Sequence, residues 1–203
     1  MSLLKVNKIC FPFLPGLNFS CDIKESERIY LSGQSGSGKT TILRSFIGFQ
    51  KVTEGSIVVF GKKLSGYTIH EIRKNTAYLS QTPFTGLSSL MEDIQDILML
   101  KANQNLMISR KQILDTMNLL GIKENQLSQS SRELSGGERQ RAALGIILIL
   151  NRKLILLDEP VSALDPLSRD LVLDRLFKDR KHTLILTSHD ASLRSYCDRE
   201  ISL

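Results

Sequence analysis

The chain has 203 residues, of which 41% are hydrophobic and 24% are charged, with only 5 prolines and 13 glycines. These proportions exclude a disordered or collagen-like protein and predict a single globular domain with a substantial core. Lys and Arg number 27 against 21 Asp and Glu, which gives a net charge of +6 without a long run of like charges. This basicity fits a phosphate-bearing ligand, nucleic acid or an anionic membrane surface, and it does not choose between them.

Cysteine spacing and apolar run lengths narrow the class further. Cys10, Cys21 and Cys197 are odd in number and form no CxxC pair, so a disulfide framework or a zinc site is not expected. We therefore expect a reducing compartment. The longest apolar stretch, residues 142–150, is far shorter than the roughly 20 residues that cross a bilayer.

The first third of the chain alternates short β-rich runs with turns. We expect strands at residues 17–23 and 28–31, and a glycine-rich segment at 33–38 follows the second strand. A helix is expected at residues 40–46, and another β-branched run lies at 57–60.

The middle third changes to a helical pattern. Apolar residues at helical spacing predict a helix over residues 87–100. Ser109 and Gln112 form a capping box at the start of a second helix, which we expect to end at Gly121. About 50 residues therefore form a helical insertion.

The last third returns to alternating α/β order. A helix is expected over residues 135–150, followed by a strand at 154–157 whose fully apolar sequence is typical of a buried parallel strand. Asp165 before Pro166 predicts the start of another helix, and residues 183–186 form a further apolar strand.

A phosphate-binding motif follows the strand at 28–31. It matches GxxxxGK[ST] in full, with the residues Gly33, Gln34, Ser35, Gly36, Ser37, Gly38, Lys39 and Thr40, and Thr41 continues the loop. Glycines let several backbone N–H groups turn toward a β-phosphate. Lys39 can reach the β- and γ-oxygens, and the Thr40 hydroxyl can ligate Mg²⁺. The strand before the loop and the helix after it are the context that this motif requires.

Two carboxylates follow the apolar strand at 154–157. Such a strand carries Asp158 and Glu159 to the edge of the sheet where ligands of open α/β sheets bind. We expect Asp158 to hold Mg²⁺ and Glu159 to act as the general base toward the attacking water.

A third motif has the sequence Leu-Ser-Gly-Gly-Glu. Ser135 caps a helix with Glu138 at its third position, and Gly136 and Gly137 leave the backbone N–H groups open to a second anion. This segment resembles the LSGGQ signature of the ATP-binding cassette (ABC) ATPases. Together with the two preceding motifs, it makes nearly the whole chain resemble that family.

The resemblance implies roles for further residues. Gln81 occupies the place of the family's Q-loop, which contacts Mg²⁺ or the attacking water, and His189 occupies the place of the switch histidine, which contacts the γ-phosphate. The D-loop, which reaches the other protomer, corresponds to Ser162, Ala163, Leu164 and Asp165. The family also stacks an aromatic ring on adenine. Phe11 is the nearest candidate here, and Phe13 is its rival.

The fold implied by the resemblance is an ABC-type P-loop NTPase. It has a mixed or parallel sheet core, an amino-terminal antiparallel β subdomain and an inserted α-helical subdomain. We expect residues 1–203 to form one ABC ATPase domain, with residues 1–82 and 150–203 in the α/β part and residues 83–149 in the helical part.

The resemblance implies an ATPase subunit of an ABC transporter, using ATP and Mg²⁺. Two copies, or one copy and a paralogous cassette, would pair head to tail around two ATP molecules. The pair would drive a membrane permease subunit that docks around Gln81, Phe84 and Met91, at the cytoplasmic face of the plasma membrane. Two alternatives remain open, a cassette that powers assembly of the iron–sulfur type and a nucleic-acid repair cassette. Because no coiled-coil or zinc insertion occurs, we expect no nucleic-acid partner.

Overall fold

The computed structural model describes residues 1–83 and 88–203. The chain forms two compact units. The first unit comprises Met1–Tyr78, Lys153–Glu159 and Arg180–Leu203, and the second comprises Leu79–Arg152 and Pro160–Asp179. The strands are β1 (Ser2–Phe11), β2 (Leu14–Lys24), β3 (Arg28–Ser32), β4 (Glu54–Val59), β5 (Lys62–Lys63), β6 (Thr76–Leu79), β7 (Leu154–Asp158), β8 (Thr183–Thr187) and β9 (Arg199–Ser202). The helices are α1 (Lys39–Phe46), α2 (Ile69–Lys74), α3 (Leu90–Met99), α4 (Arg110–Leu119), α5 (Glu124–Leu127), α6 (Gly136–Leu150), α7 (Pro166–Phe177) and the 3-10 helix η1 (Ala191–Tyr196).

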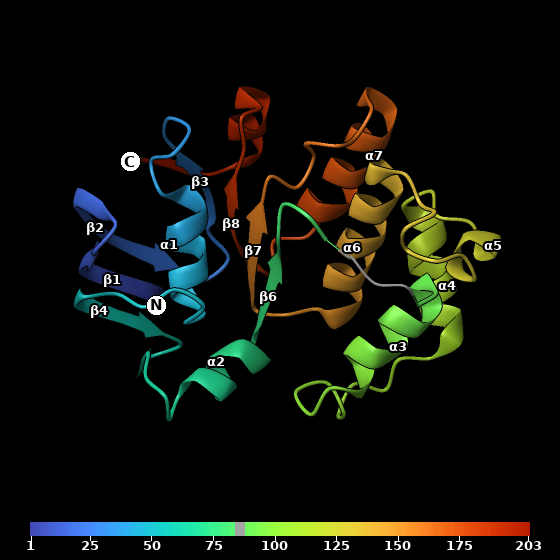
Figure 1. Cartoon of the computed structure of the whole chain (residues 1–203), viewed down its shortest axis with the longest axis horizontal. Coiled ribbons are helices and arrows are strands. Elements are labelled where there is room, and N and C mark those ends of the chain that lie inside the picture. Colours follow the sequence, from blue (N-terminus) through green and yellow to red (C-terminus); the bar gives the residue numbers. More distant parts are fainter. Residues whose placement is uncertain (84–87) are drawn as a thin grey trace. The chain divides into compact units, whose positions relative to one another are not determined.

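Two sheets organise the strands (Figure 1). One is antiparallel, with the order β2-β1-β4-β5, and the other has the order β6-β7-β8-β3-β9. In the second sheet β7 and β8 run parallel, as do β8 and β3, and β3 and β9. The carboxyl ends of β7, β8 and β3 therefore lie next to one another at one edge, where ligands of open α/β sheets bind.

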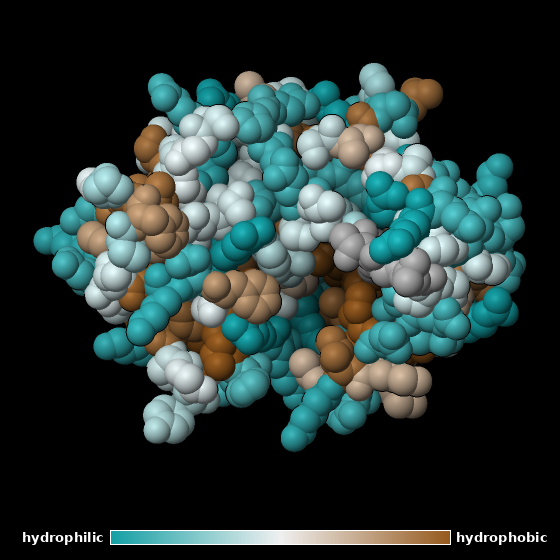
Figure 2. All heavy atoms as spheres, viewed as in Figure 1, coloured by the Kyte–Doolittle hydropathy of each residue, from teal (hydrophilic) through white to brown (hydrophobic). Residues whose placement is uncertain are grey.

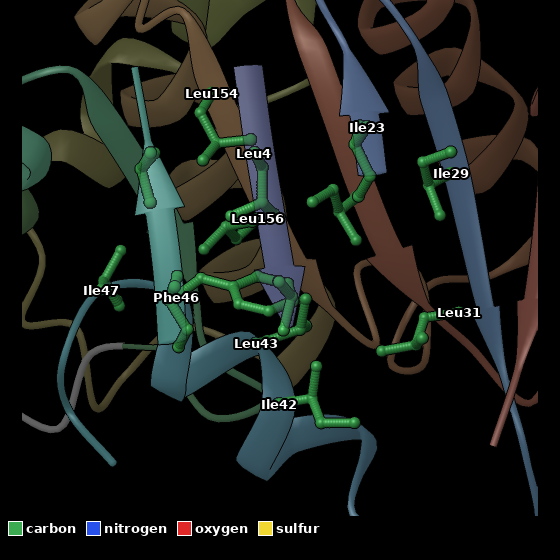
Figure 3. Packing of buried hydrophobic residues seen from close by; sticks show 14 of the residues in the cluster. Leu4, Ile23, Ile29, Leu31, Ile42, Leu43, Phe46, Ile47, Leu154 and Leu156 are labelled. Carbon is green, nitrogen blue, oxygen red and sulfur yellow. The ribbon is translucent and has the colours of Figure 1, made fainter. Parts of the chain in front are cut away.

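The core of the first unit joins both sheets to α1 (Figure 3). Ile42, Leu43 and Phe46 of α1 are buried together with residues of the antiparallel strands, such as Leu4, and of the parallel strands, such as Leu156. Each of these five side chains is at most 1% exposed. Burial on this scale fixes α1 against the sheets, and the loop between β3 and α1 is anchored at both of its ends.

The second unit has its own core, built from α3, α4 and α6 together with the segments between them. Close packing of α6 on α4 depends on Gly145, because a Cβ there would lie 2.8 Å from the sulfur of Met117. Met117 is fully buried. Ser135 caps the start of α6, and the buried residues of this helix, such as Ala142 and Ile146, belong to this core.

Most of the expected elements occur close to their predicted bounds. Ser109 caps α4 through a capping box, Gly121 adopts a φ of +72° after that helix, and Asp165 caps α7 with Pro166 in the first turn. The expected helix at 87–100 begins at Leu90, and residue 87 lies outside the described part of the chain. An α/β fold with an antiparallel β subdomain and a helical subdomain is confirmed.

Much of the face seen in Figure 2 is hydrophilic, with apolar residues also visible on it. Across the described residues, the large apolar side chains left exposed include Phe13, Phe49 and Met107. No helix in residues 1–83 and 88–203 is long and apolar enough to pass through a bilayer.

Candidate functional site

The glycine-rich loop links β3 to α1, as the phosphate-binding motif requires. Gly36 and Gly38 have φ values of +79° and +99°, in the region that side chains with a Cβ rarely adopt. A Cβ on Gly38 would also lie 2.7 Å from Leu14 Cδ1, so the loop packs closely on the start of β2. The glycine positions are therefore set by the path of the backbone.

Two polar side chains of the loop face inward. Lys39 is 8% exposed, and its Nζ donates to the carbonyl oxygens of Gly33 (2.8 Å) and Gln34 (3.0 Å). Within the described part of the chain, Ser37 Oγ is buried and has no hydrogen-bond partner. A buried hydroxyl without a partner costs free energy, and an anion held in the loop would satisfy it.

Asp158 ends β7 and accepts hydrogen bonds from the two neighbouring motifs. Its Oδ1 accepts from Thr40 Oγ1 and from Thr187 Oγ1, both at 2.9 Å, and its Oδ2 accepts from Tyr78 Oη at 3.3 Å. The carboxylate is 2% exposed. The first turn of α1 and the ends of β7 and β8 therefore meet at one carboxylate, as the strand order predicts.

Glu159 follows in a strained backbone conformation. Its φ is +55°, which is uncommon for a residue with a Cβ and is often found at functional sites. Its Oε2 accepts from Ser188 Oγ (3.3 Å) and from the backbone N–H of His189 (3.2 Å). His189 Nε2 lies 3.6 Å from Glu159 Oε1, with its side chain mostly exposed. The backbone thus turns a buried carboxylate toward a histidine that solvent can reach.

The Leu-Ser-Gly-Gly-Glu segment opens α6 in the second unit. Ser135 Oγ donates to Glu138 Oε2 (2.7 Å) and accepts from the Glu138 N–H (3.2 Å). These hydrogen bonds hold the pKa of the Glu138 carboxyl below its usual range. A Cβ on Gly137 would lie 2.9 Å from the Ala163 carbonyl oxygen, so this glycine is also required by the close approach of the 162–165 segment.

The residues of the 162–165 segment and Gln81 also belong to the second unit. Ser162, Ala163 and Asp165 are exposed, and the Ala163 N–H is fixed by the buried Gln140 through a 2.9 Å hydrogen bond. Gln81 is exposed just after β6. Phe84, one of the residues expected to meet a permease, lies outside the described residues.

The structure corrects the choice of Phe11 as the adenine platform. Phe11 ends β1, is 3% exposed and belongs to the hydrophobic core, so its ring offers no free face to a base. Phe13 is 53% exposed and its ring centroid lies 5.9 Å from that of Phe11. It directly precedes Leu14, whose side chain packs on Gly38 of the phosphate-binding loop.

The sequence predicted no role for two residues that donate hydrogen bonds to Asp158, namely Thr187 and Tyr78. Thr187 could have been found, because it ends an apolar strand directly before Ser188 and His189. Tyr78 carries no comparable signal in the sequence. Burial raises the pKa of its phenol, with the nearby Asp158 charge adding to the shift, and the hydrogen bond from Arg44 opposes both.

Comparison with known proteins agrees with the motifs. The family model described as ABC transporter matches residues 17–162. The energy-coupling factor transporter ATP-binding protein EcfA2 of Acetivibrio thermocellus is 32% identical over 92% of this chain and 70% of the relative. The corresponding EcfA1 of Ligilactobacillus salivarius is 35% identical over 92% of this chain and 67% of its own length. The lactococcin-A transport/processing protein LcnC of Lactococcus lactis is 32% identical, but this chain spans only 26% of it.

Solved structures give the same result. The ATP-binding cassette MJ0796, solved as a dimer in a post-hydrolysis state bound to ADP and Pi, superimposes with a TM-score of 0.88 and 26% identity. The alignment covers 98% of this chain and 94% of that one. The chain therefore belongs to the ABC transporter family, and it is an ATP-binding and ATP-hydrolysing subunit.

Proposed function

We propose that the loop from Gly33 to Thr41 holds the phosphates of ATP and that Asp158, Glu159 and His189 carry out hydrolysis beside it. One observation carries the proposal: Asp158 joins Thr40 of the loop to Thr187 at the end of β8 through two hydrogen bonds of 2.9 Å. These hydrogen bonds support a site in which the loop binds the phosphates beside the two carboxylates and the histidine. Lys39 would exchange its two loop carbonyl partners for the β- and γ-phosphate oxygens.

The chemistry of the donor set fits Mg²⁺. Thr40 and Asp158 offer a hydroxyl and a carboxylate, and Mg²⁺ prefers oxygen ligands and keeps several waters while it contacts substrate phosphates. Gln81 would add an amide oxygen. Bound Mg²⁺ would stabilise the negative charge that develops on the phosphates.

Glu159 would act as the general base. Its carboxylate takes a proton from water, the water oxygen bonds to the γ-phosphorus, and the bond from that phosphorus to the bridging oxygen breaks, leaving ADP and phosphate. His189 would donate to the γ-phosphate. The hydrogen bonds from Ser188 and from the His189 N–H orient the carboxylate before the substrate binds.

We propose that a second copy completes the site. A single loop leaves part of the γ-phosphate open to water, and a helix N-terminus with free N–H groups stabilises an anion. Residues Ser135–Glu138 of the opposite copy would supply this cradle, and the exposed segment Ser162–Asp165 would meet the opposite copy beside it. The dimeric MJ0796 cassette supports pairing of this kind.

The adenine ring would stack on Phe13. This exposed residue directly precedes Leu14, and the Leu14 side chain packs on Gly38 of the phosphate-binding loop. The pair of cassettes would dock on a permease around Gln81 and Met91, with Phe84, which is outside the described residues, as a further candidate contact, and so lie at the cytoplasmic face of the membrane. The names of the EcfA2 and EcfA1 relatives support a place in a transporter. One ATPase domain with an α/β part and a helical part performs all of these roles.

The test replaces the base without removing its hydrogen-bond acceptor. Glu159→Gln retains an oxygen that accepts from the His189 N–H but cannot take a proton, so ATP turnover should fall by about 10² to 10⁴ while ATP affinity is kept. Glu54→Gln, at an exposed position of β4, is the matched control and should turn over normally. Turnover by Glu159→Gln equal to that of the control would show that Glu159 is not the base.

A further inference from the structure

The Asp158 carboxylate is held on both oxygens. Thr40 and Thr187 donate to Oδ1, and both already belong to motifs at the site. Oδ2 accepts from the Tyr78 hydroxyl at 3.3 Å, and Tyr78 comes from β6, which carries no nucleotide motif. Since β6 is the neighbour of β7 in the sheet, the contact is made across the sheet.

The direction of the Tyr78 hydrogen bond is set by Arg44. The Nε–H of Arg44, on α1, donates to the Tyr78 hydroxyl oxygen at 3.2 Å. A guanidinium has donors only, so it cannot accept the phenolic proton. The one proton of the Tyr78 hydroxyl is therefore directed to Asp158 Oδ2.

The Tyr78 ring also contacts a neighbouring aromatic ring. Phe49 meets it edge-on, with ring centroids 6.2 Å apart and planes at 73°. The guanidinium of Arg73 lies 4.6 Å from the Phe49 ring centroid, and its Nε donates to the Ile47 carbonyl at 2.9 Å. Aromatic and cation–π contacts of this geometry are attractive, so the phenol is held in one orientation.

We propose that Tyr78 is a positioning residue for Asp158, and that Arg44 acts through Tyr78. The phenol fixes the carboxylate in the orientation that binds Mg²⁺, so the carboxylate does not have to be ordered when the ion arrives. Partners of this kind behind a ligand raise metal affinity. The inference rests on the proposed role of Asp158 as a Mg²⁺ ligand.

Calorimetric titration of ADP at a series of Mg²⁺ concentrations measures the effect without catalysis. Tyr78→Phe removes only the hydroxyl. ADP affinity without Mg²⁺ should be unchanged, and the apparent Mg²⁺ affinity of the ADP complex should fall about tenfold. Tyr67→Phe makes the same chemical change at a fully exposed side chain and should match the parent protein. Equal Mg²⁺ dependence in Tyr78→Phe and Tyr67→Phe would overturn the proposal.

A double variant separates positioning from general destabilisation. Arg44 is exposed, so Arg44→Gln preserves the fold even if Tyr78→Phe does not. It should weaken Mg²⁺ binding about threefold in the presence of Tyr78, since it affects only the direction of one hydrogen bond. It should have no further effect in Tyr78→Phe, because both changes act on the same hydrogen bond. Additive effects would contradict the chain from Arg44 through Tyr78 to Asp158.

Asp158→Asn separates the proposed role of Asp158 from that of Tyr78. If Asp158→Asn loses Mg²⁺ enhancement and Tyr78→Phe does not, the proposal for Tyr78 fails and the proposed site stands. If Asp158→Asn keeps the full Mg²⁺ enhancement, the proposed role of Asp158 fails, and the inference for Tyr78 fails with it.

Discussion

Phe11 and Phe13 lie two positions apart, but substitution by alanine should affect different properties at the two sites. Phe11→Ala should lower stability, and Phe13→Ala should lower ATP affinity. Phe11 is 3% exposed and packs in the core of the first unit, whereas Phe13 is 53% exposed at the turn between β1 and β2. Replacing a buried phenylalanine by alanine leaves a cavity and costs about 3 to 5 kcal/mol. Phe11→Ala should therefore lose a large share of a stability that is typically about 5 to 15 kcal/mol.

Phe13→Ala should leave stability almost unchanged, because a half-exposed ring at a turn buries little area. It should instead remove the stacking surface for adenine. Stacking of an aromatic side chain on a base contributes about 1 to 3 kcal/mol, so ATP affinity should fall at least about fivefold. Phe13→Tyr keeps a ring of the same shape and should retain the affinity.

Two measurements test whether Phe13, and not Phe11, stacks on adenine. Urea unfolding followed by circular dichroism should show a midpoint at least about 1 M lower for Phe11→Ala and unchanged for Phe13→Ala. Calorimetric ATP titration should show weaker binding for Phe13→Ala and parent-like binding for the folded fraction of Phe11→Ala. Weak ATP binding by a stable Phe11→Ala, with normal binding by Phe13→Ala, would refute the assignment.

Two further predictions concern backbone packing and thiol chemistry. Gly55→Ala should cost about 2 to 4 kcal/mol in urea unfolding, because φ is +81° and the new Cβ would lie 2.3 Å from a backbone oxygen of β1. Gly66→Ala, which meets no atom within 4 Å, should stay within about 0.5 kcal/mol, and equal costs would contradict this account. Burial raises the pKa of Cys21 and of Cys197 to about 12, so both thiols are protonated at pH 8 and should react with a disulfide reagent far more slowly than in the urea-unfolded chain. Their rates should rise about tenfold per pH unit up to pH 10, and rates equal to those of the unfolded chain would be inconsistent with the burial.

Elements with local determinants could be predicted from the sequence. The start of α6 follows from a serine and a glutamate three residues apart, and both partners of that capping box are in the motif itself. The apolar strand β7 and the acidic residues after it are also local. The resemblance to ABC ATPases then supplied the order of the motifs along the chain.

Strand β1 was not predicted, although it is central to the antiparallel sheet. Its pairing with β2 shifts register between Val6 and Ile9, and Lys8 adopts a φ of +46°. Irregularities of this kind disrupt the period of two by which a strand is recognised. Ile9 and Phe11 share the buried face of β1, and the strand ends at Phe11, so Phe13 lies in the turn and is exposed although a continued strand would place it on that same face.

The link from Tyr78 to Asp158 depends on tertiary structure. The two residues are 80 positions apart, and they meet because β6 is the neighbour of β7. Strand order is decided by packing of the complete sheet, and no local pattern carries it. The same holds for Gly137, since the carbonyl that requires a glycine there belongs to Ala163.

The central claim is that two copies share each ATP, with the loop of one copy and Ser135 of the other on the same triphosphate. Light scattering of Glu159→Gln with MgATP tests it most directly. We predict a dimer that contains two ATP molecules, and a monomer that still binds one ATP when Ser135→Arg is added. A Glu159→Gln protein that stays monomeric at saturating MgATP, or that dimerises equally well with Ser135→Arg, would contradict the account.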